Sequence, residues 1–320
     1  MIKLVFLLCL VSYDKLGMSG AQFLQIGMGA RAQALAGSYC AVGGDATSIY
    51  WNPSGISKVT GFDFFAGYSR WIEGITFTQS SFAMRKGTAS YGVQLISMKM
   101  NPIEITTVEE PEGTGMYYTA SAVAIGGATS LILTDRLSVG FGAKIVREQI
   151  YNCSADGFCV DIGSLFELYK DGLALGLVIS NFGTDMQFKG RDLSLGYNPD
   201  LLGTPYYETT IYQLPLVIRV GLSYPFRLGE KGKGLIVFQT EHPNDNRERY
   251  SFGLETQIFN TLAIRAGYIL GHDTQKYSAG FGVNVPTPWA LTSIDFAYVS
   301  RNPLTPQLFL SINLRGGEVR

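Results

Sequence analysis

Short segments in which apolar side chains alternate with small or polar ones follow one another from residue 61 to the C-terminal end of the sequence. In one of them Leu137, Val139 and Phe141 alternate with Ser138 and Gly140. Successive side chains of a β-strand point to opposite faces of its sheet, so each segment predicts a strand with one apolar face. The opposite face carries Gly, Ser and Gln more often than charged residues. This scarcity of charge argues against a sheet whose polar face meets solvent.

Composition decides between a soluble sheet and a membrane barrel. Charged residues make up 16% of the chain, against about 25% in an average soluble domain. A soluble sandwich would carry many charges on its polar face, whereas a barrel lumen accepts small and polar side chains. The apolar stretch 116–133 is rich in Ala, Gly, Ser and Thr and suits a strand as well as a helix. The sequence therefore predicts an all-β, transmembrane antiparallel β-barrel.

The number and spacing of the segments support this fold. We count fourteen, an even number, as expected for a single-chain outer-membrane barrel. Most even-numbered connections are tight, while the long ones, 100–115 and 183–212, both follow odd-numbered segments, which places them at the same end. The predicted strands are 61–70, 73–85, 87–99, 116–130, 137–150, 157–168, 172–182, 213–224, 233–242, 249–258, 262–271, 275–284, 290–300 and 306–315.

The N-terminal part has a different texture. Lys3 precedes an eight-residue apolar run, so residues 1–19 are expected to be a signal peptide for export. Residues 20–60 contain several Gly and Ala and no alternating segment, and a segment of this size can fill a barrel lumen as a plug, or hatch. The expected organisation is a signal peptide (1–19), a plug (20–60) and a barrel (61–320) in the outer membrane of a bacterial cell.

Two stretches of the expected plug carry a family resemblance. Residues 22–32 (QFLQIGMGARA) and 45–55 (DATSIYWNPSG) resemble the N-terminus of PorV/PorQ outer-membrane proteins, which are related in fold to the FadL fatty-acid transporters. The resemblance continues through 157–163, 173–183, 214–221, 242–249, 252–255 and 262–268 and covers most of residues 20–285. It implies a fourteen-stranded barrel with an N-terminal hatch inside.

The resemblance leaves two functions open. PorV-type members include a shuttle of type IX secretion, which implies a secretion accessory whose external loops, 100–115 and 183–212, bind a secreted cargo or a translocon protein. FadL-type relatives imply transport of a hydrophobic small molecule such as a fatty acid. Both require outer-membrane lipid around the barrel, and a structural barrel without transport is a third hypothesis.

Four plug residues stand in short motifs. Gly27 and Gly29 fit a loose G-x-G-x-x-A pattern, but no βαβ unit surrounds it, so tight packing against the barrel wall is favoured over nucleotide binding. Asn52 and Pro53 resemble the Asn-Pro-Ala element of FadL-type hatches. Asn before Pro favours a turn, and a role in gating and a purely structural role are both open.

Charged residues suggest contacts inside the barrel. Arg31 and Asp45 are candidates for an ion pair between plug and wall, because buried charges usually pair. The lumen-facing cationic candidates are Lys144, Arg147, Arg219 and Arg265. Each is expected either to line a polar path with a partner or to be solvated in a wet lumen.

Two cysteines and one oxygen-rich loop are candidates for disulfide and metal chemistry. Cys153 and Cys159 lie near one hairpin end, where a disulfide and two free thiols are both open. The oxygen-rich stretch 243–248 lacks EF-hand spacing and is expected to be a polar external loop rather than a metal site.

Other function classes are excluded by what the chain lacks. A net charge of −1 argues against nucleic-acid binding. The sequence has two histidines and no G-x-S-x-G motif, so we expect no catalytic residues, no metal and no cofactor, and the protein is not predicted to be an enzyme.

Overall fold

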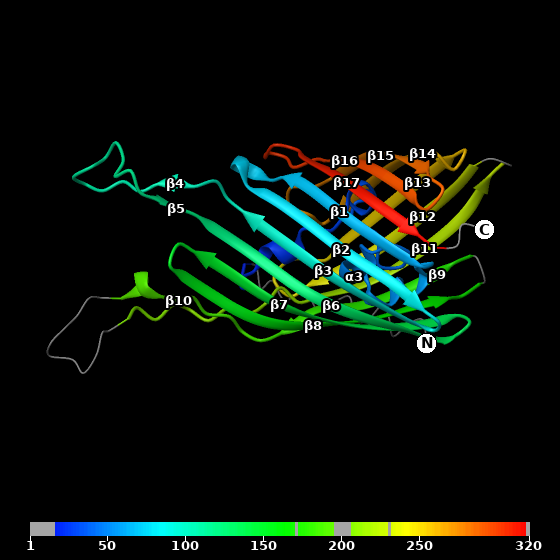
Figure 1. Cartoon of the computed structure of the whole chain (residues 1–320), viewed down its shortest axis with the longest axis horizontal. Helices are drawn as coiled ribbons and strands as arrows, with labels where there is room; N and C mark the ends of the chain where they lie inside the picture. Colours follow the sequence, from blue (N-terminus) through cyan, green and yellow to red (C-terminus); the bar gives the residue numbers. More distant parts are fainter. Residues whose placement is uncertain (1–16, 170–171, 195–205, 230–231, 318–320) are drawn as a thin grey trace.

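Fourteen long antiparallel strands close into a barrel in the computed structural model, which describes residues 17–169, 172–194, 206–229 and 232–317 (Figure 1). Closure joins β1 (Phe62–Arg70) to β17 (Gln307–Gly316), with Phe62 opposite Gly316 and Arg70 opposite Leu308. A sheet in lipid must close in this way, because an open edge would leave amide groups without hydrogen-bond partners. The predicted barrel and its strand number are confirmed.

The strand bounds follow the alternating pattern closely. The largest differences are four residues, at β6, β8 and β11. Strand β8 begins at Cys153 instead of residue 157, because Tyr151 (φ 50°) makes a two-residue turn that pairs Ile150 with Cys153. The other barrel strands are β2 (Thr76–Lys86), β3 (Ala89–Lys99), β6 (Ala120–Thr134), β7 (Leu137–Ile150), β8 (Cys153–Glu167), β9 (Ala174–Gly183), β11 (Val217–Leu228), β12 (Gly232–Pro243), β13 (Arg249–Ile258), β14 (Leu262–Leu270), β15 (Tyr277–Pro286) and β16 (Leu291–Val299).

The two ends of the barrel differ in their connections. At one end, the short-turn end, neighbouring strands are joined by tight turns. At the other, the long-loop end, two arms project beyond the barrel (Figure 1). The first arm, 100–119, contains the hairpin β4 (Ile103–Glu104) and β5 (Tyr117–Tyr118). The second arm, 184–216, contains β10 (Lys189–Gly190) and η4 (Arg191–Leu193), with 195–205 outside the described residues; the short η3 (Ile72–Gly74) links β1 to β2 at the same end.

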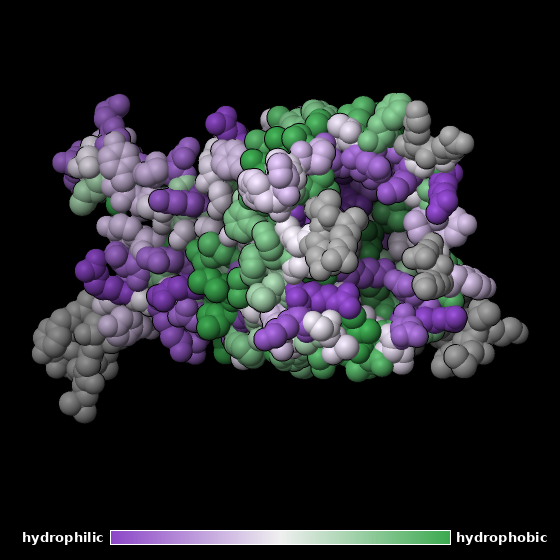
Figure 2. Space-filling view, turned by 45° about the vertical axis from the view of Figure 1, so that its right-hand side comes forward, coloured by the Kyte–Doolittle hydropathy of each residue, from purple (hydrophilic) through white to green (hydrophobic). Residues whose placement is uncertain are grey.

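The outer surface of the barrel is apolar. Side chains at outward strand positions, such as Phe64, Val93 and Phe281, remain exposed. Figure 2 shows apolar side chains over the barrel and hydrophilic ones over the projecting arms. An apolar exterior around a closed sheet is the surface that a bilayer requires. None of the described helices is both long and apolar enough to span a membrane.

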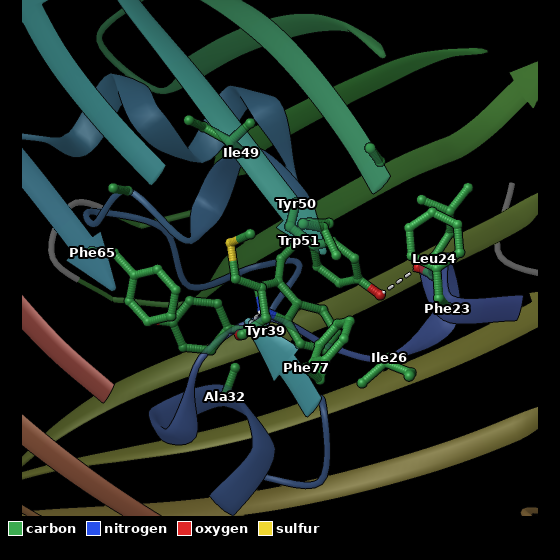
Figure 3. Close-up of a cluster of buried hydrophobic side chains, with 14 of the residues drawn as sticks. Phe23, Leu24, Ile26, Ala32, Tyr39, Ile49, Tyr50, Trp51, Phe65 and Phe77 are labelled. Carbon is green, nitrogen blue, oxygen red and sulfur yellow. Dashed lines mark hydrogen bonds between the residues drawn. The ribbon is translucent and has the colours of Figure 1, made fainter. Parts of the chain in front are cut away.

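Residues 17–60, here called the luminal segment, run through the barrel. The amide of Gly17 donates to the carbonyl of Asp245 (3.2 Å) at the long-loop end, and the segment continues into β1 from the short-turn end. It forms four short helices: η1 (Gln22–Gln25), α2 (Ala30–Ala34), α3 (Ser48–Trp51) and η2 (Pro53–Lys58). Its apolar side chains pack into a buried cluster with wall residues such as Phe65 and Phe77 (Figure 3). The expected signal peptide lies almost wholly outside the described residues.

Glycines of the inner wall make room for this segment. A Cβ atom on Gly140 would lie 2.2 Å from the backbone nitrogen of Ser54, and one on Gly163 would lie 2.1 Å from Asn52 Oδ1. No side chain tolerates such contacts, so the segment can approach the strand backbone only where the wall has glycine. The wall glycines in close contact with the segment are Gly92, Gly140, Gly163, Gly176, Gly221, Gly253, Gly267 and Gly280.

This contact gives a first prediction. Gly140→Ala should displace η2 from the wall at a cost of about 1–3 kcal/mol, because the added methyl group meets backbone atoms that cannot rotate away. We expect a higher single-channel conductance in planar bilayers, with heat-modifiable migration in gels showing that the barrel still folds. Gly127→Ala is the matched control, since the nearest atom to its Cβ would be 3.7 Å away. Equal conductance for the two variants would contradict the predicted displacement.

Candidate functional site

One carboxylate holds the start of the luminal segment at the long-loop end. Asp245, in the connection between β12 and β13, accepts hydrogen bonds from the side-chain amides of Gln22 (2.6 Å) and Gln25 (3.1 Å) and from the hydroxyl of Ser19. Asp245 is buried. The oxygen-rich stretch 243–248 thus uses this carboxylate as an anchor for the segment.

A cluster of ion pairs joins α2 to the wall. Arg31 makes a bidentate contact with Glu255 of β13, at 2.8 Å from Nε and 2.7 Å from Nη2. Arg265, opposite Glu255 on β14, donates to Glu255 at 2.6 Å and to Asp295 of β16 at 2.5 Å. Charge-assisted, bidentate contacts are among the strongest hydrogen bonds in proteins. This cluster therefore restrains the middle of the segment.

Arg31 and Asp45 are expected from the sequence to form an ion pair between plug and wall, but their contact lies within the luminal segment. The two groups lie 3.6 Å apart, but both belong to the luminal segment, so their contact does not reach the wall. The wall partner is Glu255, which sequence reasoning missed. Its signal was present, because Glu255 alternates with the inward Gly253 and lies opposite Arg265.

Asn52 and Pro53 anchor the segment to β8. The Asn52 side-chain amide donates to the carbonyls of Cys40 (2.7 Å) and Ser164 (3.0 Å), and its oxygen accepts from the amide (3.0 Å) and hydroxyl of Ser54. Asn52 thereby caps η2, which has Pro53 at its first position. These contacts fix the position of the segment on β8, and a role of the two residues in gating stays a prediction.

Gly27 and Gly29 lie where the segment passes between Trp51 and the wall. A Cβ on Gly27 would lie 2.6 Å from the Trp51 ring, and Gly29 has φ 86°. Gln79 of β2 binds both glycines, donating to the Gly27 carbonyl (3.2 Å) and accepting from the Gly29 amide (3.1 Å). The glycine pair therefore serves close packing.

Lys144 and Arg219 point into the lumen and are paired. Lys144 lies 2.7 Å from Asp161 of β8. Arg219 of β11 lies 2.8 Å from Glu241, directly opposite on β12, and its guanidinium faces the Trp51 ring at 5.6 Å. Lys144, Arg219 and Arg265 therefore have carboxylate partners. Of the two expectations for these cations, pairing and solvation in a wet lumen, the structure shows pairing.

The lumen assignment of Arg147 is wrong. Its side chain is 58% exposed and lies 3.6 Å from Asp156 on the outside of the barrel. Arg147 alternates with the inward Lys144 and Val146 and shares the outward face with Ile145. The period of two therefore already assigned Arg147 to the outer face.

The disulfide hypothesis is also wrong. Cys153 and Cys159 are free thiols on the same strand, β8. Six residues of strand separate their Cα atoms by roughly 20 Å, whereas a disulfide needs about 5.5–6 Å. The hairpin turn lies before Cys153, so the two residues cannot face each other across it.

The luminal segment separates cavities at the two ends. The outer cavity, of about 290 Å³, lies toward the long-loop end and is lined by Gly27, Trp71 and Arg219 among others. An inner cavity of about 440 Å³ lies toward the short-turn end and is lined by Gly29 and Arg31. Within the described residues, no group of three His, Cys, Asp or Glu side chains is arranged to hold a metal ion.

His272 lies in the connection between β14 and β15 and lines the outer cavity. Its Nδ1 accepts the backbone amides of Thr274 (3.2 Å) and Gln275 (3.1 Å), an arrangement that suits a neutral ring. Burial, assisted by the nearby cations Arg249 and Arg301, lowers the pKa of His272 to about 4.

Comparison with known proteins identifies the fold. No protein-family model and no curated protein matches the chain. Its structure is similar to the CymD monoaromatic hydrocarbon channel, with a TM-score of 0.62, 12% identity and coverage of 92% of this chain and 98% of that one. It is also similar to the toluene transporter TodX of P. putida (0.56, 12%, 90% and 97%) and to a FadL homologue of Pseudomonas aeruginosa (0.57, 11%, 90% and 98%).

These similarities, the closed sheet and the apolar exterior define a bacterial outer-membrane β-barrel of the FadL-like fold. In barrels of this class the long loops face the cell exterior and the short turns face the periplasm. The predicted FadL-like fold and outer-membrane location are confirmed. The narrower PorV/PorQ resemblance stays a prediction.

The ion-pair cluster gives a second prediction. Glu255→Gln should lower the free energy of unfolding by about 3–5 kcal/mol, because it removes the carboxylate that the buried Arg265, whose side chain is 5% exposed, shares with Arg31, whose side chain is 29% exposed. Urea titration in lipid vesicles measures this. Glu167→Gln is the control, since the Lys58–Glu167 pair also joins segment and wall but its side chains are 32% and 29% exposed, so its loss should cost below about 1 kcal/mol. Equal losses would contradict the assignment.

A third prediction concerns His272. The unfolded chain binds the proton more readily between pH 6.5 and about 4, so the stability due to neutral His272 is present above pH 6.5 and is lost as the pH falls toward 4. His242→Gln leaves one histidine, whose ring can be titrated by NMR. We expect a midpoint of about 4, and a midpoint near 6.5 would show that the ring is not buried as described.

Proposed function

We propose that the protein is an outer-membrane channel for small hydrophobic molecules and that the luminal segment is its gate. One observation carries this proposal: the outer and inner cavities meet the same short stretch from opposite sides. Gly27 lines the outer cavity, whereas Gly29 and Arg31 line the inner one. A shift of this stretch is the smallest movement that would join the two cavities.

The contacts of the stretch suit a gate that opens reversibly. Gln79 and Glu255 hold it through polar contacts, which can re-form after a displacement, and the glycines allow close packing in the closed state. The neighbours in fold include a hydrocarbon channel and a toluene transporter, which supports a small hydrophobic molecule as the passenger.

A second candidate function is a secretion accessory that binds a partner protein through its arms. The exposed side chains of Val108 on the first arm and of Tyr206 and Tyr207 on the second arm favour it, because aromatic and apolar groups on projecting loops are typical of binding surfaces. In this function the arms act outside the lumen, and the segment need not move.

A disulfide lock tests the gate and separates the two functions. The hydroxyls of Ser38 in the segment and Ser251 on β13 lie 2.8 Å apart, so Ser38→Cys with Ser251→Cys should bridge segment and wall in a Cys40→Ser background that removes the neighbouring thiol. We expect that cells producing the double-cysteine variant take up no radiolabelled toluene when the disulfide is oxidised. Reduction of the disulfide should restore uptake. Each single-cysteine variant is the control.

Unchanged toluene uptake in the oxidised double variant would overturn the gate and favour the partner-binding function.

A further inference from the structure

The outer cavity contains an excess of positive charge. Arg219, Arg249 and Arg301 line it, and Glu241 is the one carboxylate among its described lining residues. Glu241 contacts Arg219 at 2.8 Å and Arg249 at 3.2 Å. Arg301 donates to the side-chain oxygen of Gln307 (3.2 Å) and has no salt bridge within the part of the chain that the structure describes. His272 is buried, which lowers its pKa to about 4.

Two of these guanidinium groups keep a buried donor unused. The Nε atoms of Arg249 and Arg301 are shielded from solvent and make no hydrogen bond to any described residue. Such donors cost free energy unless an acceptor reaches them. Burial, followed by the charge of Arg249, lowers the pKa of Arg301 to about 10, and a bound anion would favour the charged guanidinium.

The rest of the cavity offers aromatic and apolar surface. Trp51 and Trp71 line it together with Phe23, Ile26 and Ile269. The guanidinium of Arg301 stacks over the Trp71 ring at 4.8 Å, which brings the positive and aromatic surfaces together. A volume of about 290 Å³ is sufficient for a molecule with one ring.

We propose that the outer cavity binds a small aromatic carboxylate, with the carboxylate between Arg249 and Arg301 and the ring against Trp51 and Trp71. This proposal rests on the proposed function for the entry of a small molecule into the lumen, and it extends the ligands of that site from neutral aromatic molecules to their carboxylate derivatives. Guanidinium groups suit the two oxygens of a carboxylate, and a neutral hydrocarbon would leave the positive charge of the cavity without a counterion.

The test uses benzoate and benzyl alcohol, which share a ring and differ in charge. Trp289 lies at the short-turn end and is exposed, so Trp289→Phe leaves Trp51 and Trp71 as the fluorescent reporters of the outer cavity. We expect a saturable fluorescence change with benzoate and a Kd at least tenfold lower than for benzyl alcohol. Equal affinity for the two probes would overturn the proposal.

Arg301→Gln in the same background identifies the group responsible. We expect it to weaken benzoate binding at least tenfold and to leave benzyl alcohol binding unchanged, while the outward-facing Arg147→Gln removes the same charge and binds benzoate like the parent. Heat-modifiable migration confirms folding of each variant. Undiminished benzoate binding by Arg301→Gln would contradict the proposal. Failure of the gate is seen separately, in the toluene uptake of the disulfide-locked protein.

Discussion

The structure depends on one constraint: a sheet that crosses lipid must satisfy every backbone hydrogen bond within itself. Pairing of β1 with β17 meets this constraint by closing the sheet. Closure of fourteen strands encloses a lumen wider than wall side chains alone can fill. The luminal segment fills this space. Its backbone is irregular, so it is held by contacts with the side chains and glycines of the surrounding strands.

Two kinds of contact hold the segment, and they have different physical consequences. Wall glycines, such as Gly140 and Gly163, allow backbone and short side chains to touch the strands, which gives dense packing without polar cost. Ion pairs, above all Arg31 with Glu255, compensate charges that the lumen has desolvated. Packing of the first kind favours one closed position, while polar contacts of the second kind can be exchanged for contacts with water or ligand. This combination is what a gate requires.

The barrel could be predicted from the sequence because its signal is local. Alternation within a single strand, as in 137–150, fixes both strand and face, and the predicted segments correspond to the fourteen observed strands. The site was harder to predict because its partners are distant in sequence: Arg31 meets Glu255, 224 residues away. The misplaced Arg147 is a different case, since strict use of the alternation would have assigned it to the outer face. Asp245 was missed for a third reason: nothing in the sequence of a polar loop distinguishes a residue that anchors a segment inside the barrel.

The central claim is that the segment between residues 20 and 60 is folded into the lumen as firmly as the strands around it. Hydrogen–deuterium exchange in lipid nanodiscs measures this directly, peptide by peptide. The account predicts that peptides covering 27–37 and 48–58 exchange as slowly as those from β7 and β13, because their amides are buried and bonded. Exchange as fast as that of the first arm would contradict it, and would mean that the lumen is open in the membrane.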